Sequence, residues 1–72
     1  MNRAALDAAL LAAHAAGDRA ALVAHYTRAA EIAGDAAAEG FFLTHAYIYA
    51  LEAGHAEAPA LHARLKAAGR ED

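Results

Sequence analysis

The chain has 72 residues, 26 of them alanine and none cysteine, and its formal net charge is −3 at pH 7. This length predicts one small domain, and the lack of cysteine excludes disulfide scaffolds, zinc ribbons and cysteine nucleophiles. The acidic balance does not favour a nucleic-acid partner, and no apolar run reaches the roughly 18 residues that span a membrane.

The first predicted helix covers residues 3–16. The start of the chain does not resemble a secretory signal, because Asp7 interrupts the apolar stretch there. We therefore expect a cytoplasmic protein. Alanines form one broad side of this helix, where small side chains let a second helix approach closely. His14 falls on its outer face, as His25 and His62 do on the second and fourth helices.

Glycine and aspartate mark the remaining helix ends. Two Gly-Asp pairs, at 17–18 and 34–35, each combine a residue that ends a helix in the left-handed conformation with one that caps the next helix. Gly54 closes a third segment, and Pro59 falls in a first turn, where its missing amide hydrogen costs nothing. The helices are expected at 3–16, 19–33, 36–53 and 57–68.

Short connections between these segments make neighbouring helices antiparallel. We predict an all-α fold of two stacked helix-turn-helix hairpins in a single domain over 1–72. The first hairpin covers about 3–33, the second about 36–68, and 69–72 form a tail. Apart from alanine and Met1, the chain has only 16 apolar side chains. A core with so few large apolar side chains favours self-association or binding to a partner.

The third helix differs because apolar side chains cover nearly its whole circumference. Such a helix is normally buried, yet three other helices cannot easily surround it. Phe41 and Ile48 share a sector with His45 and Glu52, so we expect this sector to contact a second copy or a different protein. The alternative is that His45 and Glu52 lie at the rim of an internal core. The predicted interaction surface is Phe41, His45, Ile48, Tyr49 and Glu52.

A shift of 37 residues aligns Gly17 with Gly54, so two helical pairs of about 35 residues follow each other. The residues Ala16, Gly17, Asp18, Leu22, Tyr26 and Ala29 resemble the turn and second helix of a tetratricopeptide repeat. Ala46, Tyr47 and Gly54 resemble the first helix of a second, degenerate repeat. The resemblance implies a piece of α-solenoid that recognises peptides or proteins and carries no catalytic chemistry. Two repeats are fewer than such arrays usually need, which again favours a homodimer.

A metal site is the alternative function. The chain has five histidines, and residues 52–55 match the Glu-x-x-His motif of di-iron bundles. A homodimer brings two copies of Glu52 and His55 together, and Glu31 or Glu39 would add a further carboxylate. Against this interpretation, no two histidines lie four residues apart, and Gly54 ends the helix inside the motif.

Catalysis is not predicted. The chain has no serine and no Gly-rich phosphate loop. Thr44 and His45 diverge by about 100° on a helix, so they cannot form a nucleophile–base pair with each other. We therefore expect neither an enzyme nor a bound cofactor. The expected role is that of an adaptor, a regulatory subunit or an assembly factor.

Overall fold

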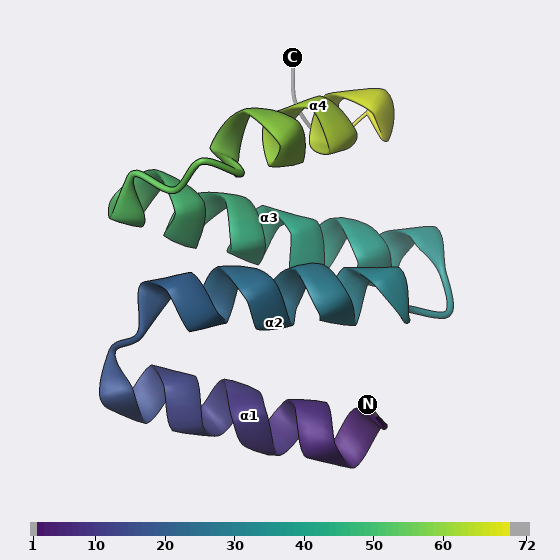
Figure 1. The fold of residues 1–72 in the computed structure, drawn as a ribbon. Helices are drawn as coiled ribbons and strands as arrows, with labels where there is room; N and C mark the ends of the chain where they lie inside the picture. Colours follow the sequence, from purple (N-terminus) through teal and green to yellow (C-terminus); the bar gives the residue numbers. More distant parts are fainter. Residues whose placement is uncertain (1, 70–72) are drawn as a thin grey trace.

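The computed structural model describes residues 2–69, and this part of the chain consists of four α-helices without a strand. The helices are α1 (Arg3–Ala16), α2 (Arg19–Glu31), α3 (Ala36–Ala53) and α4 (Ala58–Ala67). They lie side by side in chain order (Figure 1), and within residues 2–69 only consecutive helices bring their backbones into contact. The Cα atoms extend over 32 × 29 × 14 Å, so the molecule is a plate. The predicted all-α fold class is confirmed.

Side-chain caps begin three of the helices. The side chains of Asn2, Asp18 and Asp35 each accept a hydrogen bond from the amide three residues further on, at 2.8, 3.1 and 2.7 Å. Each bond satisfies an amide that has no partner inside its helix. Gly17 and Gly54 end α1 and α3 in the left-handed conformation, with φ of 66° and 62°. The predicted boundaries of these two helices are therefore confirmed.

The end of the second helix differs from the prediction. α2 ends at Glu31, two residues early, and Gly34 is not among the glycines with positive φ. The amide of Ala33 bonds the carbonyl of Ala30 at 3.3 Å, so a tighter turn follows the last helical residue. The chain then reaches Asp35 in an extended conformation, with φ of −153° and ψ of 165°. α4 is one residue shorter than predicted at each end.

The main core lies between α2, α3 and α4. It consists of Val23, Ala30, Leu43, Ala46, Ala50, Leu61 and Leu65, all at most 2% exposed. The other buried apolar residues belong to α1 and α2, which contact each other: Leu6, Ala13, Leu22 and Ala29. None of the five Phe and Tyr residues is fully buried. Aromatic side chains therefore lie around the core, where they remain accessible.

Two further predictions concern the whole chain. No helix within residues 2–69 has the length and apolar character needed to cross a membrane. The predicted tail falls mainly on 70–72, which lie outside the described residues. The helices pack as a small all-α bundle, and the likeness to tetratricopeptide repeats stays a prediction.

Candidate functional site

One side of α3 is apolar and exposed. Its opposite side contributes Leu43, Ala46 and Ala50 to the core. The outward residues Phe41, Ile48 and Leu51 are 57%, 47% and 56% exposed, although each is a large apolar side chain. Thr44 lies between them and is also exposed. We call these four residues, Phe41, Thr44, Ile48 and Leu51, the α3 seam.

The α3 seam has no charge and no free hydrogen-bonding group on its one polar side chain. The hydroxyl of Thr44 donates a hydrogen bond to the carbonyl of Gly40, one turn earlier, at 2.8 Å. At the edge of the seam, Nδ1 of His45 donates to the carbonyl of Phe41 at 2.9 Å, since a carbonyl can only accept. Covering the seam would therefore leave neither of these two donors unpaired.

The predicted surface residues fall into three environments. Phe41 and Ile48 belong to the α3 seam, and His45 lies beside Phe41 with a ring-centroid distance of 4.4 Å. Glu52 is exposed, and its Oε1 lies 2.9 Å from Nε of Arg19 on α2. Tyr49 is half-buried and stacks on the ring of Tyr26 of α2.

Sequence reasoning missed Thr44 and Leu51, which complete the α3 seam. The signal was present in their spacing. Steps of three, four and three residues connect Phe41 to Leu51, and such steps keep side chains on one face of a helix.

Rings from three helices gather around Tyr26 of α2. Tyr49 of α3 stacks on it at 5.8 Å with an interplanar angle of 12°, and His45 lies 5.1 Å away. His14 of α1 meets both tyrosine rings edge-on, and its Nε2 is hydrogen-bonded to the Tyr26 hydroxyl at 2.9 Å. Burial, with a smaller contribution from Tyr49, raises the pKa of Tyr26. The ring cluster comprises His14, Tyr26, Phe41, Phe42, His45 and Tyr49.

The outward placement predicted for three histidines holds for His14 and needs correction for His25 and His62. His14 is exposed but bonded to Tyr26. His25 is half-buried beside α1, and His62 is half-buried against Tyr47, with ring centroids 5.4 Å apart. Neighbouring helices cover parts of the faces that a single helix would leave in solvent.

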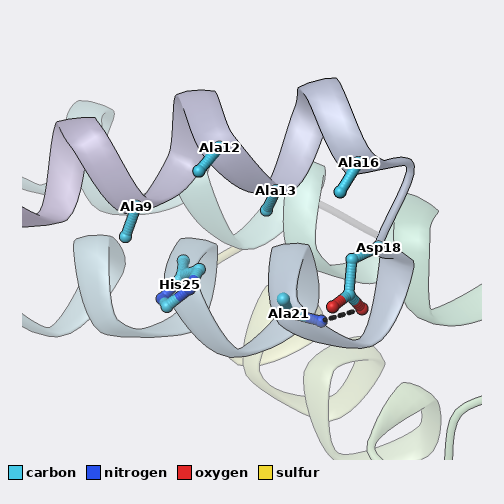
Figure 2. A pocket seen from close by; sticks show the side chains of 7 residues that line it. All are labelled: Ala9, Ala12, Ala13, Ala16, Asp18, Ala21 and His25. Carbon is cyan, nitrogen blue, oxygen red and sulfur yellow. Dashed lines mark hydrogen bonds between the residues drawn. The ribbon is translucent and has the colours of Figure 1, made fainter.

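A shallow groove separates α1 from α2 on one side of their contact (Figure 2). Its volume is about 320 Å³, and five of its seven lining residues are alanines. The carboxylate of Asp18 at one end is already engaged, since it caps α2 through the amide of Ala21. His25 supplies the other polar side chain. The groove therefore presents few polar or charged groups to a ligand.

The residues of the alternative metal site are separated by the end of a helix. Glu52 lies on α3 and pairs with Arg19, whereas His55 follows Gly54 in the connection to α4. Nδ1 of His55 accepts a hydrogen bond from the amide of Glu57 at 3.0 Å. Within residues 2–69, no three His, Asp or Glu side chains are grouped as metal ligands.

Known proteins offer no guide to these surfaces. Comparison of the chain with protein-family models, with curated protein sequences and with solved structures finds no match. The functional argument therefore rests on the exposed chemistry of α3.

Proposed function

We propose that this protein is a small, non-catalytic protein–protein interaction module that self-associates through the α3 seam. The observation that carries the proposal is the exposure of Phe41, Ile48 and Leu51 along one side of α3. Contiguous apolar patches on a soluble protein usually mark an interaction site. In the cytoplasm, such a module would act as an adaptor, a regulatory subunit or an assembly factor.

The size of the core supports self-association. The buried apolar residues are five leucines, one valine and five alanines. Chains below about 80 residues rarely obtain more than about 3–5 kcal/mol from a single core, and oligomerisation is one common supplement. Burying the α3 seam against a second copy would add large apolar side chains to that core.

Light scattering after size-exclusion chromatography tests the proposal directly. The wild-type mass should rise from 7.4 kDa towards twice that value as concentration increases. Ile48→Asp should remain monomeric, because the seam would then have to bury a carboxylate. Its helical circular dichroism should be unchanged, since residue 48 is exposed.

Leu11→Asp is the matched control, because Leu11 is 71% exposed on α1, outside the α3 seam. It should associate like the wild type. A wild-type mass of 7.4 kDa at every concentration would refute the proposal. Equal association by Ile48→Asp and the wild type would do the same.

A further inference from the structure

The spacing of the α3 seam is the same in both directions along the helix. From Phe41 the steps are three residues to Thr44, four to Ile48 and three to Leu51. A second α3 running the opposite way therefore presents exposed residues at matching heights. The spacing is that of the a and d positions of a helix pair.

We propose that two copies of the chain pair their α3 helices antiparallel, with Phe41 of each copy against Leu51 of the other. In this register Thr44 of each copy meets Ile48 of the other. The inference rests on the proposed function, and it adds the orientation and the register of the pair. Because α2 and α4 flank α3 within the plate (Figure 1), the exposed seam faces one broad side, where a second plate can approach.

Packing favours the antiparallel arrangement. Each layer then combines two different side chains, Phe with Leu or Ile with Thr, so that successive layers have similar volumes. A parallel pair would instead place Phe41 against Phe41 and Thr44 against Thr44, which gives one crowded and one thin layer. It would also align the two helix dipoles and put both copies of Glu52 at one end.

The polar groups along α3 permit this burial. The Thr44 hydroxyl and Nδ1 of His45 donate to carbonyls of their own helix, at 2.8 and 2.9 Å. The nearest carboxylate, that of Glu52, pairs with Arg19 of the same chain. Glu52 borders the seam one turn after Ile48, and because it already has a partner, covering the seam does not take an unpaired ion out of water.

The α3 seam is short for a specific interface. Specific interfaces begin at about 1,200 Å² in total, or about 600 Å² per copy. That is about one seventh of the accessible surface of 4233 Å². From Phe41 to Leu51 the seam follows about 15 Å of α3. Parts of α2 and α4 beside it must therefore contribute to the contact.

Engineered cysteines can determine the register, because the chain contains no other thiol. Phe41→Cys and Leu51→Cys chains are mixed in equal amounts and oxidised, and the disulfide-linked products are separated by mass. The antiparallel pair brings residue 41 of one copy near residue 51 of the other, within disulfide reach. The mixed product should be about five times as abundant as each homodimeric product. Random pairing would make it only twice as abundant as each.

A mixture of Thr44→Cys and Ile48→Cys chains tests the same register at the neighbouring layer. It should also favour the mixed product, and it covers the case in which loss of Phe41 or Leu51 weakens association. Leu11→Cys mixed with Leu51→Cys is the matched control, since both residues are exposed and lie on different helices. This control should give random pairing only.

The outcomes separate this inference from the proposed function. Predominant 41–41 and 51–51 products would indicate a parallel pair and overturn the inference, although the module would still self-associate. Random pairing in both test mixtures, with a wild-type dimer that Ile48→Asp abolishes, would show another register and overturn it as well. A wild type that is monomeric at all concentrations would overturn both proposals.

Discussion

The contact between α1 and α2 and the buried cluster shared by α2, α3 and α4 are built from different side chains. Around α3, leucines and a valine combine with alanines into one buried cluster of seven residues. Between α1 and α2 only Leu6, Ala13, Leu22 and Ala29 are buried, and an alanine-lined groove remains open beside them. Alanine lets helix backbones approach closely, but it does not fill the space between them. The larger side chains therefore supply most of the burial.

Rings and one cation help to hold α1 on the side away from the groove. His14 bonds the hydroxyl of Tyr26, and the guanidinium of Arg3 lies 5.7 Å from the centre of the Phe42 ring. These contacts are exposed or half-buried, so solvent weakens them. We infer that α2, α3 and α4, which share one buried cluster, unfold together, and that α1 can detach from them.

The largest expected effects come from truncating one buried leucine in α3 and one in α1. Leu43→Ala and Leu6→Ala should each lower the free energy of unfolding by about 2–5 kcal/mol, since both residues are fully buried. Leu43→Ala should destabilise α2, α3 and α4 together. Leu6→Ala should first release α1, which hydrogen exchange of individual amides would detect. Equal acceleration of exchange in α1 and α3 by Leu6→Ala would contradict a separable α1.

A larger side chain in the groove should stabilise the contact between α1 and α2. Ala12 lines the groove (Figure 2), so Ala12→Leu should raise the free energy of unfolding by about 0.5–2 kcal/mol. Ala15→Leu is the control, because Ala15 is exposed on the same helix and does not line the groove. Denaturant titration of both variants measures the difference. An equal gain in the control would show that groove filling does not explain the effect, since Leu has a slightly lower helix propensity than Ala.

The smallest effect concerns the ring cluster. Tyr26→Phe removes the hydrogen bond to His14, which should cost about 0.5 kcal/mol at neutral pH because the bond is exposed. The raised pKa of Tyr26 means that the folded state favours the neutral phenol. The stability from this preference is present below about pH 10, where unfolded tyrosine is also neutral, and is lost as pH rises through the folded-state pKa.

Thermal unfolding between about pH 8 and 11 would show this loss in the wild type. In Tyr26→Phe the loss should be smaller, because the titrating group is gone. Tyr47→Phe, which leaves the ring cluster intact, should keep the full wild-type loss. The same pH dependence of thermal unfolding in all three proteins would show that Tyr26 does not cause this loss of stability.

Helix boundaries were predictable where a side chain or a glycine defines them locally. Gly17 and Gly54 end their helices in the left-handed conformation, and Asp18 and Asp35 cap the helices that follow. The end of α2 has no such signal. The turn after Glu31 depends on how the chain must reach α3, which no residue near Gly34 encodes by itself.

The candidate surface was only partly predictable, because a helical wheel gives angles without showing which angles a neighbour covers. Phe41 and Ile48 share a sector in the sequence and lie exposed in the structure. Tyr49 was assigned to the same surface, but Tyr26 and His14 cover part of its ring. Contacts between rings of different helices involve residues distant in sequence, so no local pattern indicates them.

The order of the helices has a consequence for how the chain folds. Within residues 2–69 only consecutive helices bring their backbones together, so most backbone contacts close short loops and lose little chain entropy. Proteins with such local contacts fold in microseconds to milliseconds. During synthesis, α2 and α3 can pack before α4 has been made. If the proposed dimer forms, collision of two finished chains would then be the slow step, and its rate would depend on how much of the protein the cell makes.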